Sequence, residues 1–160
     1  MSEQSIQKIL YATDLGEHTR PAFRMALSLA QRYGAKLIIL HSMESLGAIN
    51  HLFHAYVSEE NTEKFRKTAH AEITEKIHQR VATFCQEIIG HPVEESEFVE
   101  RIVVLEDSAE VAILREAEHD QVDMIVLGTR THSRLSELVL GSTAHKVIQL
   151  AKVPVLVVPI

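Results

Sequence analysis

Cysteine is scarce in this sequence, and long hydrophobic runs are missing. The only cysteine, Cys85, excludes an internal disulfide and a cysteine-based zinc site. Because it lies in an apolar helical pattern, we interpret it as a small core residue. The longest apolar run, residues 153–160, is far shorter than the roughly 20 residues that a membrane helix needs. The sequence therefore predicts no membrane insertion.

Basic charge is also in short supply. The chain has 16 Lys and Arg against 22 Asp and Glu, so its net charge is −6 with neutral histidines. A chain of this charge lacks the basic surface that non-specific nucleic-acid binding requires. Its first residues show neither the basic nor the apolar region of a secretory signal. We expect a cytoplasmic protein with one globular domain over residues 1–160 that binds no nucleic acid.

Short apolar runs alternate with longer amphipathic stretches along the chain. This alternation predicts an α/β fold, in which helices cover both faces of a parallel sheet. The strands are predicted at residues 9–12, 37–40, 99–105, 124–127 and 153–158. The helices are predicted at residues 19–33, 65–88, after a capping Ser108, and at 142–151.

The residues that follow the strands are the first candidates for a site. Parallel sheets of this kind bind ligands beyond the carboxyl ends of their strands. The residues at these positions are Thr13-Asp14, His41-Ser42, Glu106-Asp107 and Gly128. We expect His41 to face this cleft, whereas His70 is interpreted as a surface position.

A split glycine pattern gives the strongest local signal. Gly128 follows a strand, where the lack of a side chain allows a ligand or the backbone to approach closely. Gly141 and Ser142 precede a helix, whose first N–H groups suit a phosphate. Arg130 and Arg134 in the intervening loop add positive charge. On spacing alone, the favoured interpretation is that Gly141 only makes a turn and Ser142 only caps a helix.

Two common phosphate motifs are missing from the sequence. There is no G-x-x-x-x-G-K-[ST], which argues against a P-loop NTPase. There is no G-x-G-x-x-G after the first strand, which argues against a nicotinamide or flavin dinucleotide.

Four segments resemble the universal stress protein family, and together they cover nearly the whole chain. Residues 9–14 read ILYATD, residues 123–130 DMIVLGTR, residues 140–144 LGSTA and residues 153–159 VPVLVVP. The resemblance implies a role in stress response and a Rossmann-like sheet of five parallel strands in the order 3-2-1-4-5. It also implies a homodimer joined through the C-terminal strand from Val153 to Val158.

The ATP-binding branch of that family carries the pattern G-x2-G-x9-G-[ST]. Gly128, Gly141 and Ser142 match it, but Thr131 replaces the middle glycine. A β-branched residue is a poor occupant of a positive-φ position, although its hydroxyl could contact a phosphate if the glycine only leaves room. The nucleotide-binding residues implied by the resemblance are Ala12, Thr13, Asp14, Ser42, Leu127, Gly128, Arg130, Thr131, Gly141, Ser142 and Thr143.

The implied ligand is ATP, with Mg²⁺ as its companion ion. Carboxylates at Asp14, Glu106 and Asp107 would oppose a phosphate unless a cation bridges them or they point away. His51 and His54 have a spacing compatible with two metal ligands, but no third ligand is evident, and we interpret them as packing residues.

Three functions remain open on the sequence. The leading one is a homodimeric universal stress protein that binds ATP as a regulatory ligand. The alternative is a nucleotide-free universal stress protein that acts as a dimeric interaction module, which Thr131 favours. An enzyme, at most a slow ATPase, ranks last because the sequence shows no positioned nucleophile and base and no lysine in the loop.

Overall fold

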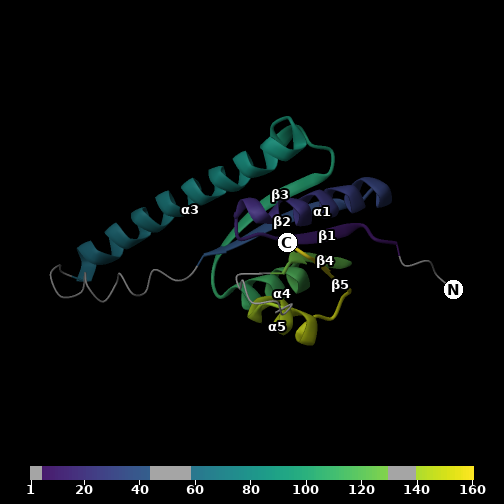
Figure 1. Cartoon of the computed structure of the whole chain (residues 1–160). Coiled ribbons are helices and arrows are strands. Elements are labelled where there is room, and N and C mark those ends of the chain that lie inside the picture. The colour runs from purple at the N-terminus through teal and green to yellow at the C-terminus, as the bar shows by residue number, and fades with distance from the viewer. Residues whose placement is uncertain (1–4, 44–58, 130–139) are drawn as a thin grey trace.

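The computed structural model describes residues 5–43, 59–129 and 140–160 (Figure 1). Within them, five parallel strands form one sheet in the order β3-β2-β1-β4-β5, which confirms the predicted fold class and strand order. The strands are β1 (Lys8–Ala12), β2 (Lys36–Met43), β3 (Val99–Glu106), β4 (Met124–Gly128) and β5 (Val155–Val158).

Helices cover both faces of this sheet, as predicted (Figure 1). One pair, α1 (Arg20–Tyr33) and α3 (Glu59–Ile89), lies on one face, and α4 (Ala109–His119) and α5 (Ser142–Leu150) lie on the other. Two short 3-10 helices, η1 (Glu17–Thr19) and η2 (Val93–Glu95), complete the described elements. The N-terminal part of α3 reaches beyond the sheet in Figure 1, and the residues of this helix that pack in the core lie in its C-terminal half.

The core on the α1 and α3 face is built around aromatic side chains. The ring of Phe23 lies 5.3 Å from that of Tyr11 and 5.9 Å from that of Phe84, measured between centroids. Burial raises the pKa of the Tyr11 hydroxyl to about 12. Cys85 is fully buried in the same cluster, as predicted, and burial raises its pKa to about 12. Its thiol therefore stays protonated and unreactive at neutral pH.

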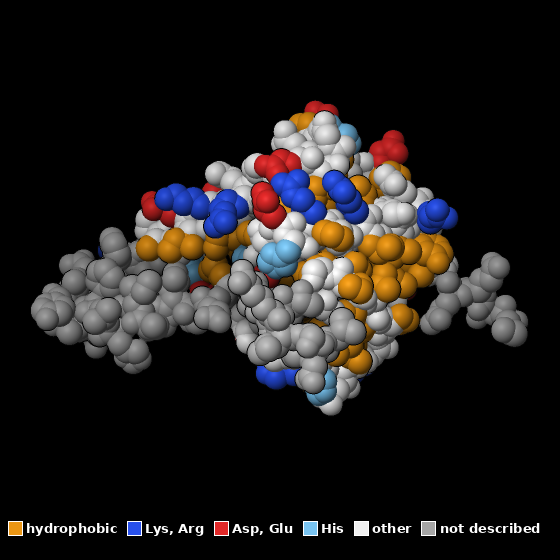
Figure 2. Space-filling model, in the orientation of Figure 1, with side chains coloured by type: hydrophobic (Ala, Val, Ile, Leu, Met, Phe, Trp, Pro, Cys, Tyr) orange, Lys and Arg blue, Asp and Glu red, His pale blue; other side chains and the backbone are white. Residues whose placement is uncertain are grey.

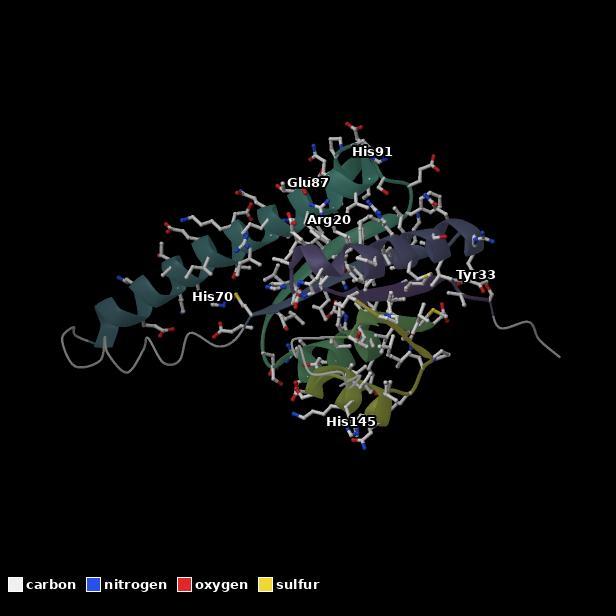
Figure 3. All side chains as sticks on the ribbon, viewed as in Figure 1. Arg20, Tyr33, His70, Glu87, His91 and His145 are labelled. Atoms are coloured by element: carbon white, nitrogen blue, oxygen red, sulfur yellow. The ribbon has the colours of Figure 1, made fainter. Side chains whose placement is uncertain are left out.

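An ion pair joins the two helices of this face. Arg20 Nη2 lies 2.6 Å from Glu87 Oε2, and the guanidinium lies over the ring of Phe84 at 5.8 Å from its centroid (Figure 3). The charge pair and the cation–π contact hold α1 and α3 in register, next to the loop that follows β1.

The structure confirms the predicted start of the helix after Ser108 and corrects the start of the last strand. Ser108 occupies the N-cap position of α4, but its hydroxyl makes no capping hydrogen bond; its N–H instead donates to Asp107 Oδ1 at 2.8 Å. The last strand begins at Val155 and not at Val153. The reason is Pro154, which has no N–H to donate to a sheet ladder, although its carbonyl still accepts from Ile125 N at 3.0 Å.

The last strand, β5, lies at an edge of the sheet, as the strand order implies, and pairs with β4. Figure 2 shows hydrophobic side chains gathered on the face where β5, β1 and the end of α1 lie in Figure 1. Among the described residues, no helix is long and apolar enough to cross a membrane.

Candidate functional site

A pocket of about 820 Å³ opens at the carboxyl ends of β1, β2, β3 and β4. Nine of the eleven predicted site residues line it, whereas Arg130 and Thr131 lie outside the described residues, as do Arg134, His51 and His54. Its position agrees with the rule that such sheets bind ligands beyond the carboxyl ends of their strands. The predicted residues that line it are Ala12, Thr13, Asp14, Ser42, Leu127, Gly128, Gly141, Ser142 and Thr143.

The loop after β1 forms one wall of this pocket and is held by its own hydrogen bonds. Thr13 N donates to Leu40 O at 2.9 Å, which continues the pairing of β1 with β2. Leu15 N donates to Thr13 Oγ1, and Gly16 N donates to Asp14 Oδ1, both at 3.0 Å. These bonds hold Leu15 at a φ of +64°, a region that non-glycine residues rarely adopt. The loop that carries Thr13 and Asp14 is therefore held in place by its own hydrogen bonds.

His41 supports this wall from behind. Its Nδ1 lies 2.8 Å from Thr13 O, and the side chain does not line the pocket. The expectation that His41 faces the cleft is therefore wrong. In β2 the side chains alternate between the two faces, so Leu40 and Ser42 reach the pocket and His41 turns to the α1 and α3 side.

Two helices point their N-terminal ends into the pocket. The first turn of α5 contributes Ser142 and Thr143, as the sequence predicted, and the first turn of α4 contributes Ala109 and Glu110. The first N–H groups of a helix have no partner within the helix, and its N-terminal end carries a partial positive charge. Two such ends at one pocket favour an anionic group there. The sequence did not indicate that α4 reaches the site, because Ser108 indicates only where this helix begins and not what its first turn faces.

The surroundings of Gly128 differ from those that the sequence predicted, because a residue of the chain's own end lies beside it. A Cβ atom built on this residue would lie only 2.5 Å from Cδ1 of Ile160, which also lines the pocket. The space that the missing side chain leaves is therefore taken by Ile160. The sequence could not show this contact, because the two residues lie far apart in the chain. Hydrogen bonds at the neighbouring Thr129 place the end of the chain here: Thr129 N donates to Val158 O, and Ile160 N donates to Thr129 Oγ1, 31 residues away.

Each acidic side chain of the pocket wall contacts a basic one. His18 Nε2 lies 3.3 Å from Asp14 Oδ2, and His70 Nε2 lies 2.5 Å from Glu106 Oε2. The other two ion pairs are Arg115 Nη1 with Asp107 Oδ2, at 3.0 Å, and Lys146 Nζ with Glu110 Oε1. The hydrogen bond from Lys146 lowers the pKa of Glu110. Arg115 and Lys146 thus offset the charges of Asp107 and Glu110, whereas His18 and His70 offset those of Asp14 and Glu106 only when they carry a proton.

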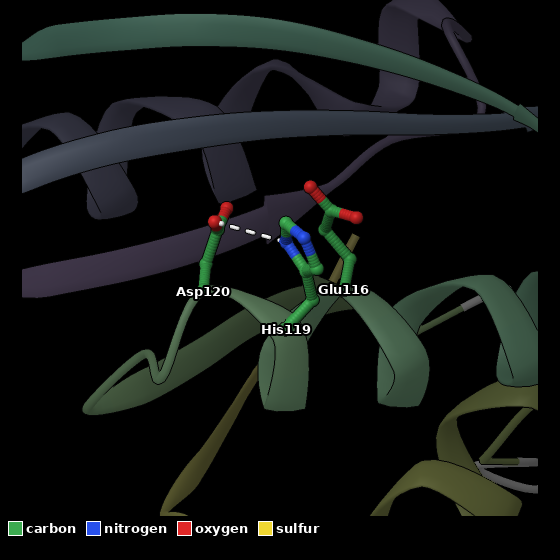
Figure 4. A group of neighbouring side chains, drawn as sticks. All are labelled: Glu116, His119 and Asp120. Atoms are coloured by element: carbon green, nitrogen blue, oxygen red, sulfur yellow. Dashed lines mark hydrogen bonds and ion pairs between the residues drawn. The ribbon is translucent and has the colours of Figure 1, made fainter.

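A second group of ligand-type side chains lies at the far end of α4, away from the pocket (Figure 4). Glu116, His119 and Asp120 place one ligand atom each within 4.8 Å of one another. However, Arg101 Nη2 lies 2.7 Å from Glu116 Oε1 and also bonds to Asp120 Oδ2. A guanidinium already occupies the place of the cation, so we interpret this group as a clamp between α4 and β3.

Comparison with known proteins agrees with this fold. The chain belongs to the universal stress protein family, whose family model matches residues 5–159. Curated proteins give no match to the chain.

Solved structures of universal stress proteins share the fold. The protein described as hypothetical protein MJ0577 superposes with a TM-score of 0.71 at 22% identity, over 98% of this chain and 97% of that one. UspA from Lactobacillus plantarum gives 0.61 at 22% identity, over 96% and 97% of the two chains. A universal stress protein in complex with cAMP gives 0.64 at 18% identity, over 96% and 97%.

Proposed function

We propose that this chain is a stress-response protein that binds an adenine nucleotide, with ATP as the leading candidate, in the pocket at the carboxyl edge of its sheet. The observation that carries the proposal is the convergence of two helix N-terminal ends, α4 and α5, on a pocket that also contains Gly128, Gly141 and Ser142 of the split glycine pattern. Such an arrangement suits a phosphate group next to an uncharged base.

The pocket divides into two chemically different parts. Ala12, Leu127 and the backbone near Ser42 surround the strand ends and would contact the adenosine. The first turns of α4 and α5 also line the pocket and would hold the phosphates. A volume of about 820 Å³ lies within the range of small-molecule and cofactor sites.

Known structures of similar fold support an adenine nucleotide. One universal stress protein is described in complex with cAMP, and one from Archaeoglobus fulgidus, 19% identical, in complex with dAMP. Mg²⁺ would enter with a triphosphate and be held by its oxygens, because Asp107 and Glu110 are already engaged by Arg115 and Lys146.

The proposed role is regulatory and cytoplasmic. A bound nucleotide would stabilise one arrangement of the pocket edge and thereby change the surface that the protein offers to a partner. The sequence feature against nucleotide binding is Thr131, and the alternative of a nucleotide-free interaction module rests on it.

Isothermal titration with ATP, with and without Mg²⁺, tests the proposal. Gly141→Val places a branched side chain at the start of α5 and is expected to lower affinity at least tenfold. Ala151→Val, at the other end of the same helix, adds similar bulk outside the pocket and should bind as the unmodified protein does. Thr131→Gly separates the two functions: tighter binding would mean that the threonine limits the site. Unmodified protein and Thr131→Gly that both ignore ATP and cyclic AMP would leave the nucleotide-free alternative.

We also propose a homodimer through β5. The strand has an open edge, its four residues are half-buried, and an apolar surface surrounds it (Figure 2). Exposed strand edges invite pairing with another chain, and the same strand of a second copy would cover this one.

A further inference from the structure

Two histidines contact carboxylates of the pocket wall without lining the pocket themselves. His18, in η1, pairs with Asp14, and His70 projects from α3 toward the carboxyl edge of the sheet, where it pairs with Glu106 (Figure 3). The side chains of these two pairs are between 26% and 42% exposed, so protons from solvent reach both histidines. Two elements on the same face of the sheet thus place a titratable base at the same pocket.

The other two carboxylates of the wall have bases of a different kind. Arg115 and Lys146 ordinarily keep their positive charge throughout the physiological range. Histidine is the residue whose ordinary pKa places its change of charge between about pH 5 and 8. Of the four pairs, the two that contain a histidine are therefore the ones whose type of base can gain a proton in this range.

We propose that the pocket takes up protons at His18 and His70 when it binds an anionic nucleotide, so that affinity for the nucleotide rises as the pH falls. The inference rests on the proposed function and adds a regulation of the same site. The sign follows from linkage: a phosphate near the wall stabilises the positive form of each histidine. By the same linkage, each proton that binds favours the phosphate.

The charged groups around each histidine leave this sign unchanged. In η1 and α1, Glu17 Oε1 lies 3.9 Å from Arg20 Nη2 beside His18. One turn before His70 in α3, Lys67 Nζ lies 3.6 Å from Glu63 Oε1. Side chains of these three types, Glu, Arg and Lys, ordinarily keep their charge between about pH 5.5 and 8. His41 contacts the backbone carbonyl of Thr13 and not a carboxylate, and it is retained in all variants below.

The size of the effect depends on the separation between each histidine and the phosphate. A unit charge about 8 Å from a phosphate, at an effective dielectric constant of roughly 40, changes affinity about fivefold. Two histidines would thus change it by roughly twentyfold between about pH 8 and 5.5, and the gain would shrink at high salt.

Titration calorimetry with cyclic AMP tests the inference, because the single phosphate charge of this nucleotide does not change in that range. Measurements in two buffers of different ionisation heat count the protons taken up on binding. The unmodified protein should take up protons near pH 6.5 and bind roughly twentyfold more tightly at about pH 5.5 than at about pH 8. His18→Gln/His70→Gln should lose the uptake and show a flat profile.

His78→Gln/His91→Gln is the matched control, because it removes two histidines from α3 and the turn that follows it, and neither contacts a carboxylate of the pocket wall. It should retain both the uptake and the pH profile. Should the glutamine variant unfold, His18→Asn/His70→Asn replaces it, and the proton count on the unmodified protein needs no variant.

The possible results separate the two proposals. Proton uptake that is absent in the unmodified protein, or that persists in the double variant, would overturn the histidine mechanism while leaving nucleotide binding intact. A failure of both cyclic AMP and ATP to bind at any pH would overturn the proposed function, and the proton coupling with it.

Discussion

The side chain of Ile160 lies directly over Gly128, with its Cδ1 atom 2.5 Å from where a Cβ of residue 128 would stand. The contact joins the end of β4 to the chain beyond β5 at the mouth of the pocket. A Cβ contact this short cannot persist, so any side chain at position 128 has to displace Ile160.

Gly128→Ala is therefore expected to destabilise the protein by only about 1 kcal/mol, because the added methyl group meets the flexible end of the Ile160 side chain, which can turn aside. Ile160→Ala should relieve the clash, so the alanine at position 128 should cost little in the Ile160→Ala background. Urea denaturation of the two single variants and the double variant measures the coupling. An equal cost of Gly128→Ala in both backgrounds would show that the contact with Ile160 is not what limits the side chain at position 128.

Lys146 is expected to support anion binding through Glu110, which lines the pocket. Lys146→Met removes the cation and leaves a carboxylate at the phosphate end, so affinity for ATP should fall roughly fivefold. Affinity for uncharged adenosine should change little. Lys152→Met is the matched control, because Lys152 makes a similar pair with Glu118, 2.8 Å away, outside the pocket. Equal loss with ATP and adenosine would point to a change of shape and not of charge.

Much of this architecture could be read from the sequence, for physical reasons. Runs such as residues 37–40 are apolar without alternation because both faces of β2 are buried, and Gly34 ends α1 with a φ of +64°. Ligand sites follow strand ends in such sheets, and this rule together with the family resemblance pointed to the nine predicted residues that line one pocket.

What the sequence could not show are contacts between residues far apart in the chain. The sequence places His70 on the surface of a helix and gives no sign of a partner. The packing of α3 against β3 brings it to Glu106, and that packing is not visible in the sequence. The same holds for Ile160 over Gly128 and for the first turn of α4 at the pocket. Hydrophobic periodicity predicts which side of an element is buried, but it does not predict which polar groups meet at its ends.

Arg101 is expected to matter for stability, because it bonds to two carboxylates, one on the 7%-exposed Glu116 and one on Asp120. Arg101→Met would leave both without their cation, and since Arg101 is itself 38% exposed, solvent screening reduces the cost to about 2 kcal/mol. Arg115→Met removes a more exposed arginine and should cost less than about 1 kcal/mol. Denaturant unfolding of the two variants compares them. Added Zn²⁺ that restored the stability of Arg101→Met would show that Glu116, His119 and Asp120 also form a metal site.

Val157 is the residue of β5 at which the proposed homodimer can be tested. Ile125 N donates to Pro154 O and Thr129 N to Val158 O, so the even-numbered residues of this segment turn their carbonyls toward β4. In an extended strand the alternate residues turn theirs away, and the backbone of Val157 therefore faces the open edge.

Val157→Pro would remove an N–H on that open edge while leaving the bonds to β4 in place, so it should convert the dimer to a monomer. Val157→Thr keeps the N–H and the shape of the side chain and should remain dimeric. Size-exclusion chromatography with light scattering measures the mass of each, and circular dichroism shows whether the proline variant stays folded. Unmodified protein that elutes as a monomer at micromolar concentration, or a folded proline variant that remains a dimer, would show that copies of this chain do not associate through the edge of β5.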